Sequence, residues 1–216
     1  MHKQPDKGRQ IYAALVAILG WLAVALQFYL IIDNRATTVP ETVIRFFSFF
    51  TILTNILVAW CFTNQWLKAN EDGTRFFARP TTLTAVTVYI TLVGLVYNLL
   101  LRFLWHPQGL QRIVDELLHS VIPVLVVLYW GIFVPKSDLK WKDTFSWLLY
   151  PLVYSLYIVI RGAWSGFYPY PFIDVTKLGY SSALLNSAGL IMAFWLMSLL
   201  LVAVGKFTSP KYSSTV

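Results

Sequence analysis

The sequence predicts an all-helical, polytopic membrane protein: a bundle of six transmembrane helices with both termini in the cytoplasm. Of its 216 residues, 57% are hydrophobic and only 12% are charged, whereas soluble domains carry about 25% charged residues. The charges also leave six uncharged runs, each close to the roughly 20 residues that a helix needs to cross a bilayer. These runs cover residues 11–32, 46–67, 80–101, 117–135, 144–160 and 178–205. Both observations exclude a soluble enzyme, a secreted disulfide scaffold and a nucleic-acid-binding domain.

The first three spans are expected at residues 11–32, 42–67 and 80–104. The first follows a basic start, and its apolar run is long for the core of a signal peptide, so we expect it to be retained. The second and third begin at Pro40 and Pro80. Proline in the first turn of a helix costs no hydrogen bond, because the N–H that it lacks would be unpaired anyway.

The last three spans are expected at residues 114–134, 143–163 and 180–205. Pro135 ends the fourth span, whereas Pro123 and Pro151 lie inside spans four and five. An interior proline removes the hydrogen bond to the carbonyl four residues earlier, which for Pro123 is that of His119. The connections are short, so the chain is expected to form a single domain. An aromatic, proline-rich loop, residues 164–179, joins the last two spans.

The distribution of basic residues predicts the orientation. Placing the N-terminus in the cytoplasm puts residues 1–10, 68–79, 136–142 and 206–216 on the inner side. Those segments hold eleven of the 17 Lys and Arg residues, whereas the outer loops proper hold only Arg35, Arg112 and Lys177. This bias is the positive-inside rule. The net charge of +7 therefore reports topology rather than a polyanionic partner, and no nucleic acid is expected to bind.

Polar side chains from four spans are expected at one depth below the outer surface. With a rise of about 1.5 Å per residue, Thr51 lies about 9 Å below Arg45, and His119 lies about 8 Å below the start of its span. Asn98 and Asn186 fall at a similar depth. Because polar groups inside a membrane are costly, each one calls for a partner or a role.

Helical spacing adds further side chains to this layer, because residues three or four apart share a face. The groups that share a face are Ser48, Thr51 and Asn55; Asn98 and Arg102; and Asp115, Glu116 and His119. Together these side chains suit acyl transfer. A hydroxyl becomes a good nucleophile when a neighbouring base takes its proton, and histidine is the usual base. Amide or cationic donors would stabilise the oxyanion.

Each feature also has a purely structural interpretation. Threonines in membrane helices often bond to the carbonyl four residues earlier, and Thr54, Thr84, Thr87 and Thr91 are expected to do so. The asparagines could simply join helices, and a charged group near the interface often pairs or snorkels. A metal site at Asp115 and His119 would lack a second histidine, so none is expected.

Three short motifs resemble the androgen-induced/androgen-dependent TFPI-regulating protein family, whose prokaryotic branch consists of small six-span membrane proteins. The motifs are Phe49-Phe50-Thr51-Ile52-Leu53, His119-Ser120-Val121-Ile122-Pro123 and Tyr170-Pro171-Phe172-Ile173-Asp174. Their order, their spacing and the six-helix plan extend the resemblance over nearly the whole chain. Here the aromatic residue that precedes the third motif is Tyr168, within a longer and more proline-rich loop.

The resemblance implies a mechanism. Animal members of that family are membrane hydrolases that cleave fatty acid esters of hydroxy fatty acids, with an intramembrane threonine as nucleophile and a histidine as its partner. Those roles would fall on Thr51 and His119, with Thr54 as the rival nucleophile. The longer loop and the prokaryotic branch leave the substrate open.

The resulting hypothesis is a lipid hydrolase of a prokaryotic cytoplasmic membrane, with its site nearer the outer face. A fatty acyl ester from the bilayer would be its substrate, and no cofactor is implied. Asp115 would orient His119, and Asn55, Asn98 or Arg102 would contact an oxyanion or a carboxylate. The alternatives are a carrier or receptor that binds a lipid or another small molecule without reaction, and a structural partner subunit.

Overall fold

The computed structural model describes residues 7–67, 76–104 and 106–208, and within these ranges it is helical without any strand. The α-helices are α1 (Lys7–Asp33), α2 (Val39–Phe46), α3 (Phe50–Leu67), α4 (Pro80–Val96), α5 (Gly109–Glu116), α6 (Ile122–Phe133), α7 (Asp143–Trp147), α8 (Leu149–Ser165) and α9 (Val175–Thr208). Four short elements join them: the 3₁₀ turns η1 (Phe76–Ala78) and η4 (Pro171–Ile173), and the π-helical turns η2 (Tyr97–Leu101) and η3 (Leu117–Val121). The expectation of an all-helical chain is confirmed.

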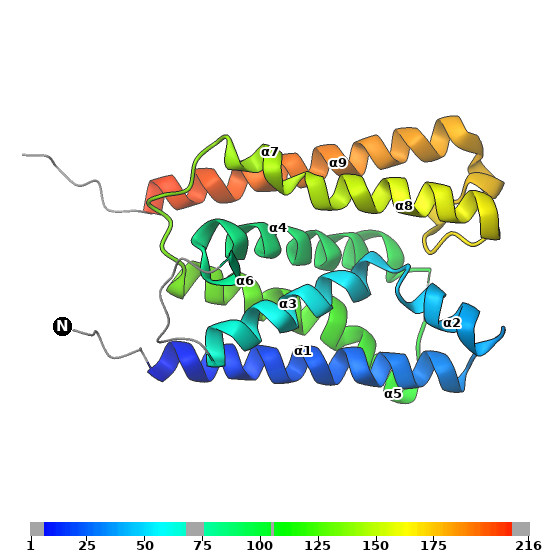
Figure 1. Ribbon diagram of the computed structural model, residues 1–216, viewed down its shortest axis with the longest axis horizontal. Coiled ribbons are helices and arrows are strands. Elements are labelled where there is room, and N and C mark those ends of the chain that lie inside the picture. Colours follow the sequence, from blue (N-terminus) through cyan, green and yellow to red (C-terminus); the bar gives the residue numbers. More distant parts are fainter. Residues whose placement is uncertain (1–6, 68–75, 105, 209–216) are drawn as a thin grey trace, which may run out of the picture.

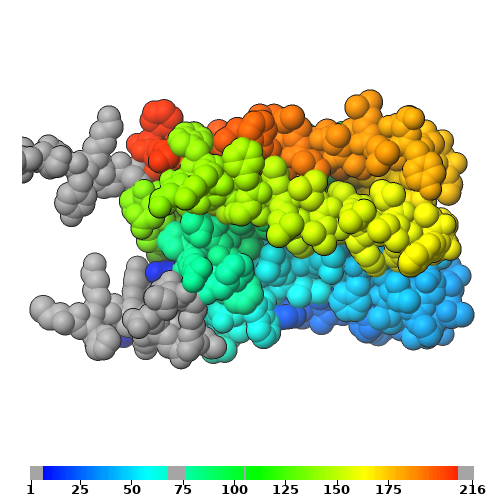
Figure 2. Space-filling view, turned by 45° about the horizontal axis from the view of Figure 1, so that its top comes forward, coloured from blue at the N-terminus to red at the C-terminus, as the bar shows by residue number. Residues whose placement is uncertain are grey.

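The helices run roughly parallel to one long axis (Figure 1). Helix α4 lies at the centre and packs against α3, α6 and α9, while α1 packs against α3 and α6. Figure 2 shows α8 and α9 side by side along one face of the molecule. The beginning of α1 and the end of α9 lie at the same end of the bundle, and α2 lies at the other (Figure 1).

Five helical segments are long and apolar enough to cross a membrane, and the bent pair of α2 and α3 would make a sixth. Their outward faces carry large apolar side chains; Leu185 on α9 and Leu156 on α8, for example, are 73% and 62% exposed. Such a surface suits lipid rather than water, since soluble proteins rarely expose contiguous apolar patches. The helices therefore suggest an integral membrane protein. The expected inner residues Lys3, Lys68, Arg75 and Lys211 lie outside the described residues.

The expected second span, 42–67, is not one continuous helix. It is broken between α2 and α3, which meet at an angle of 68°. Ser48 lies in the break, so it does not share a helical face with Thr51 and Asn55 as its spacing suggested. The hydroxyl of Tyr154 donates to the Ser48 carbonyl at 2.9 Å, which stabilises the break by pairing a carbonyl that no helix uses.

Spans three and four each contain a π-helical turn; in span four the sequence predicted only the hydrogen bond lost at Pro123. In η2 the Arg102 N–H donates to the Tyr97 carbonyl, five residues earlier, at 2.8 Å. In η3 the Ile122 N–H reaches the carbonyl of Leu117 in the same way. Such turns are rare and often lie at functional sites. Here they hold Asn98 and His119, two of the polar side chains that the sequence singled out.

The last two spans are also longer and less regular than expected. A break after α7 separates it from α8, and Gly166, with φ 68°, ends α8. Helix α9 begins at Val175 and bends at Gly179, whose φ of 74° is a conformation that favours glycine. The segment between Gly166 and Val175, called here the outer loop after the side on which the sequence predicts it, folds back onto the bundle at the end where α2 lies (Figure 1).

Candidate functional site

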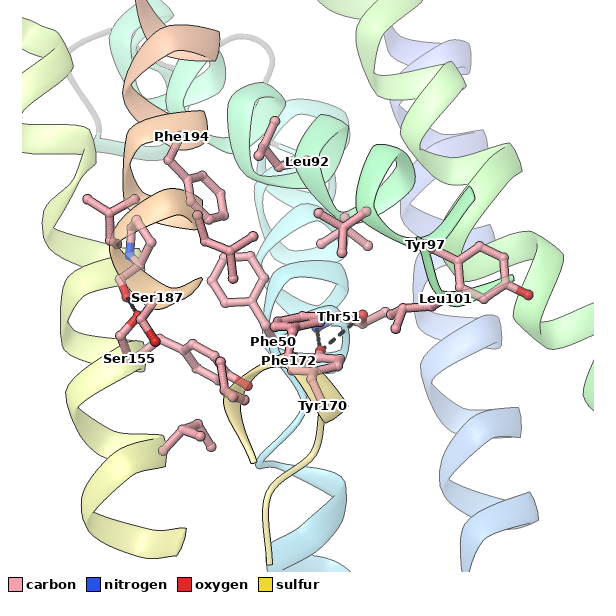
Figure 3. Close-up of a pocket in the computed structure, with 18 of the residues that line it drawn as sticks. Phe50, Thr51, Leu92, Tyr97, Leu101, Ser155, Tyr170, Phe172, Ser187 and Phe194 are labelled. Carbon is pink, nitrogen blue, oxygen red and sulfur yellow. Dashed lines mark hydrogen bonds between the residues drawn. The ribbon is translucent and has the colours of Figure 1, made fainter. Parts of the chain in front are cut away.

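Thr51 lies in the first turn of α3, where backbone N–H groups have no partner inside the helix. Its own N–H donates to the hydroxyl of Tyr170 at 3.3 Å, and its Oγ1 lies 3.5 Å from the same hydroxyl (Figure 3). The break before α3 leaves no helical carbonyl four residues back, so Thr51 does not show the back-bonding common for threonine. Its side chain is buried, with 8% of the residue exposed.

Tyr170 reaches Thr51 because its neighbours in the outer loop fix its ring. Pro169 and Pro171 flank it and restrict the backbone. The ring stacks on Phe172 at 5.2 Å with an interplanar angle of 4°, and it meets the edge of Phe49 at 5.9 Å. Figure 3 shows the two stacked rings directly beside Thr51.

The outer loop is attached to α2 and α8 by charged side chains. Phe167 lies under the guanidinium groups of both Arg45 and Arg161, at 4.5 Å and 5.0 Å. Glu41 pairs with both arginines, at 2.8 Å and 2.9 Å. In addition, Gly162 gives space to Tyr168, because a Cβ at Gly162 would lie 2.1 Å from the ring. These contacts hold the loop that carries Tyr170.

His119 lies on η3, and Asp115 fixes its ring. Nδ1 of His119 lies 2.9 Å from the Asp115 carbonyl and 3.3 Å from its carboxylate. A carbonyl can only accept, so Nδ1 must carry the proton in the neutral ring. Nε2 then keeps its lone pair and can accept a proton from a nucleophile. The spacing of Asp115 and His119 suggested this pairing.

Tyr97 completes the support of the imidazole. Its hydroxyl donates a hydrogen bond to the carboxylate of Asp115, and its ring stacks on His119 with centroids 4.1 Å apart. The guanidinium of Arg102 lies over the Tyr97 ring, 5.2 Å from its centroid. The histidine is thus held by a hydrogen bond on one nitrogen and by a parallel ring on its face.

Asn98 compensates for the N–H that Pro123 lacks. Its Nδ2 donates to the His119 carbonyl at 3.2 Å and to the Gly94 carbonyl at 2.8 Å. Gly94 allows α4 to approach this segment closely. A Cβ at that position would lie only 3.1 Å from both the His119 carbonyl oxygen and Pro123. Asn98 therefore positions the backbone of His119 and lines neither of the cavities described below.

Asn55 links the two elements that carry Thr51 and His119, called here the candidate pair. Its Nδ2 donates to the Thr51 carbonyl at 2.9 Å and to the Leu118 carbonyl at 3.3 Å. Its Oδ1 is buried without a hydrogen-bond partner. An unpaired buried oxygen is costly, whereas the amide nitrogen of Asn55 joins α3 to η3.

Glu116, Arg102 and Asn186 have other partners. Glu116 pairs with Arg102 at 2.6 Å and accepts from Ser120, so it does not contact His119. Arg102 also donates to the Oδ1 of Asn98 at 2.9 Å. Asn186 is exposed and donates to the Phe172 carbonyl at 2.8 Å, so it supports the outer loop from α9. Its depth along the helix suggested the site, but its face does not point there.

Two cavities meet at the candidate pair. One lies between α4, α8 and α9 and has a volume of about 70 Å³; the other lies between α1, α3, α5 and the outer loop and has a volume of about 480 Å³. Both are lined by Thr51, Tyr97, Leu101, His119 and Tyr170. Among the contacts of the described residues, no hydrogen bond joins Thr51 to His119; the two side chains face the same space instead.

Thr54, the rival nucleophile, lines neither cavity and bonds to the hydroxyl of Tyr150 at 3.2 Å. This also differs from the back-bonding expected of it, which Thr84, Thr87 and Thr91 do show. Within the described ranges, no group of three or more His, Cys, Asp and Glu side chains could hold a metal ion. The geometry thus brings together a hydroxyl, an oriented imidazole and a phenol.

Comparisons with protein-family models, curated proteins and solved structures give no match for this chain.

Proposed function

We propose that the protein is an integral membrane hydrolase that cleaves fatty acyl esters. The observation that carries the proposal is that Thr51 and His119 line the same two cavities while Asp115 leaves Nε2 of His119 free to accept a proton. The resemblance of the Thr51, His119 and Tyr170 motifs to membrane threonine hydrolases supports the same reaction.

In this mechanism Oγ1 of Thr51 attacks the ester carbonyl and its proton passes to Nε2 of His119. The tetrahedral intermediate then expels the alcohol, which takes the proton back from His119. Water, activated by the same imidazole, releases the acid from the acyl-threonine. Catalytic hydrogen bonds often form only in the complex with substrate, so the bound ester would bring Thr51 and His119 into contact.

Tyr170 and the first turn of α3 would stabilise the oxyanion. The hydroxyl of Tyr170 and the N–H of Thr51 lie next to the nucleophile. The N-terminus of α3 adds partial positive charge, which favours a negative oxygen. Removing one donor from such a site typically slows the reaction by a factor of about 100 to 1,000.

The proposed orientation puts both termini in the cytoplasm and the site near the outer face of a cytoplasmic membrane. The beginning of α1 and the end of α9 lie at one end of the bundle, and the outer loop lies at the other (Figure 1). Three basic residues lie at the end of the bundle where α1 begins and α9 ends: Lys7, Arg9 and Lys206. The positive-inside rule favours that end for the cytoplasm.

A lipid-like alkyl fluorophosphonate tests the proposed function. It should add covalently to the purified wild-type protein, which intact-mass measurement would show. The fraction of fatty acyl ester hydrolysis that is lost should match the fraction of protein that is labelled. Thr51→Ala should lose both the adduct and the activity, whereas Thr54→Ala should keep both.

The second candidate function is binding of a lipid without reaction. It is favoured by one contact, the pairing of Thr51 Oγ1 with Tyr170 rather than with His119. A wild-type protein that binds the ester but neither hydrolyses it nor reacts with the fluorophosphonate would select this candidate. If the protein neither binds nor hydrolyses the ester, the result would favour a structural subunit.

A further inference from the structure

The two cavities that meet at Thr51 differ in what they offer a ligand. The smaller one extends along α4 and α9 from Thr51 towards Leu92 and Phe194 (Figure 3). The larger one extends the other way, beneath the outer loop and towards α1 and α5. An ester bound with its carbonyl at Thr51 would therefore place its acyl and alcohol parts in separate cavities.

Beyond its Thr51 end, the smaller cavity has mostly apolar walls and, among the described residues, no free hydrogen-bond donor. Ser155, Ser187 and Tyr154 also line it, but their hydroxyls are already used. Ser155 donates to the Pro151 carbonyl and Ser187 to the Ala183 carbonyl, both at 2.8 Å. Tyr154 donates to the Ser48 carbonyl in the break before α3. A polar group entering this cavity would find no free donor, so the cavity suits an acyl chain.

The larger cavity is lined mainly by apolar side chains, with a few polar groups among them and no positively charged side chain among the described residues. Gln27 and Gln111 bond to each other at 2.8 Å, and Asn34 donates to the Leu30 carbonyl at 2.9 Å. Among the described residues that line this cavity, the one charged side chain is the carboxylate of Asp115. Of the described residues that line either cavity, none is Lys or Arg.

The guanidinium group beside the site is already neutralised. Arg102, which directly follows η2, pairs with Glu116 at 2.6 Å and does not line either cavity. An anionic ligand would thus lose its hydration without gaining a cation, and it would face the carboxylate of Asp115. Burying an unpaired charge is strongly unfavourable, and a like charge adds repulsion.

We propose, building on the proposed function, that the substrate is an ester without charge on either side of the reacting carbonyl. Its acyl chain enters the smaller cavity from the Thr51 end, and its uncharged alcohol part lies in the larger one. A fatty acid ester of a hydroxy fatty acid, the class cleaved by the family that this sequence resembles, carries a free carboxylate on its alcohol part. The walls of the larger cavity disfavour that group.

Matched ester pairs test the proposal. For the alcohol side, the pair is the octanoyl ester of β-hydroxybutyric acid and the methyl ester of the same compound, which differ by one carboxylate close to the ester. For the acyl side, the pair is para-nitrophenyl octanoate and the mono-para-nitrophenyl ester of suberic acid. The neutral member should have a kcat/KM at least about 10-fold higher, because an unpaired buried charge costs well over 1.4 kcal/mol. Equal or better turnover of the anionic members would overturn the proposal.

A cation added to the larger cavity should reverse the preference. Gln111→Arg puts a guanidinium in its wall, so kcat/KM for the free β-hydroxybutyrate ester should rise at least about 5-fold relative to its methyl ester. Gln108→Arg is the matched control, because Gln108 is exposed at the same end of α5 and lines neither cavity. An equal change in both variants would mean that only surface attraction is measured, and it would count against the proposal.

Binding separates this proposal from the proposed function. Thr51-dependent hydrolysis that prefers the anionic esters would leave the function standing and remove the neutral substrate. If no ester is hydrolysed in a Thr51-dependent way, the proposed function fails. The cavities are then tested by thermal unfolding of Thr51→Ala with each pair: greater stabilisation by the neutral members supports the proposal, and equal or smaller stabilisation overturns it.

Discussion

The hydroxyl of Tyr170 lies 3.3 Å from the backbone nitrogen of Thr51 and 3.5 Å from its Oγ1. These two residues are 119 positions apart in the chain, and the contact joins the outer loop to the broken start of α3. It gives the threonine a hydrogen-bond partner outside its own helix. It also places a phenol where both cavities meet.

Tyr170→Phe removes this hydroxyl and keeps the ring that stacks on Phe172. We expect kcat for ester hydrolysis to fall about 100-fold, in line with the loss of one oxyanion donor, while KM changes little. Tyr150→Phe is the control, since Tyr150 also bonds a threonine of α3 but lines neither cavity. Steady-state kinetics on both variants give the comparison. A similar loss in the two would assign Tyr170 a structural role.

The hydrogen bond from Asn98 to the His119 carbonyl should matter because Pro123 cannot supply one. Asn98→Ala leaves that carbonyl without a side-chain donor, and we expect unfolding to become easier by about 1–3 kcal/mol. In a Pro123→Ala background, position 123 has an N–H again, so the same change should cost less. Thermal or denaturant unfolding of the four proteins measures this coupling. Equal costs in both backgrounds would contradict the compensation.

The sequence predicted those parts of the site that depend on helical spacing within one element. Asp115 and His119 are four residues apart, and so are Asn98 and Arg102; both pairs are in contact. Depth along a helix was less informative. It placed Asn186 in the polar layer, but depth does not say which way a side chain points, and Asn186 lies on the exposed face of α9.

The break before α3 and the contact of Tyr170 had no local signal. Residues 46–50 contain neither proline nor glycine, and an apolar run favours a continuous span. The break depends instead on distant partners: Tyr154 bonds the Ser48 carbonyl, and Tyr170 bonds the Thr51 N–H. Of the two π turns, only the second had a hint in the sequence, because Pro123 has no N–H to offer the His119 carbonyl.

Gly162 should be required for the position of the outer loop. An added Cβ would lie 2.1 Å from Tyr168, so Gly162→Ala must displace that ring. We expect a loss of about 1–3 kcal/mol, the usual cost of overpacking, together with lower activity as the loop that carries Tyr170 shifts. Gly189→Ala on α9 is the control, because nothing lies within 4 Å of its Cβ. Only the first variant should lose thermal stability and ester hydrolysis.

Asp174 should make the end of the outer loop sensitive to acid. The hydroxyl of Thr176 donates to Oδ1 of Asp174 at 2.5 Å, and this bond lowers the pKa of the carboxyl below its ordinary value. A lowered pKa means that the stabilisation is present at neutral pH and is lost as the pH falls through the folded pKa. Thr176→Val removes the hydroxyl, so it should melt lower at neutral pH, and the difference should shrink in acid. A melting difference that stays constant down to strongly acidic pH would exclude this linkage.

The candidate pair should behave as one unit. If Thr51 attacks the ester and His119 takes its proton, each group is ineffective without the other, so losses from the two changes should be far from additive. Thr51→Ala and His119→Ala should each abolish measurable hydrolysis of a neutral fatty acyl ester, and the double variant should be scarcely worse. Thr51→Ser should retain activity, because it keeps the hydroxyl and loses only a methyl group. All four variants should still bind the ester, since the cavity walls remain. Should the two single variants hydrolyse the ester normally and only melt at lower temperature, Thr51 and His119 would be structural groups joining α3 and η3 to the bundle.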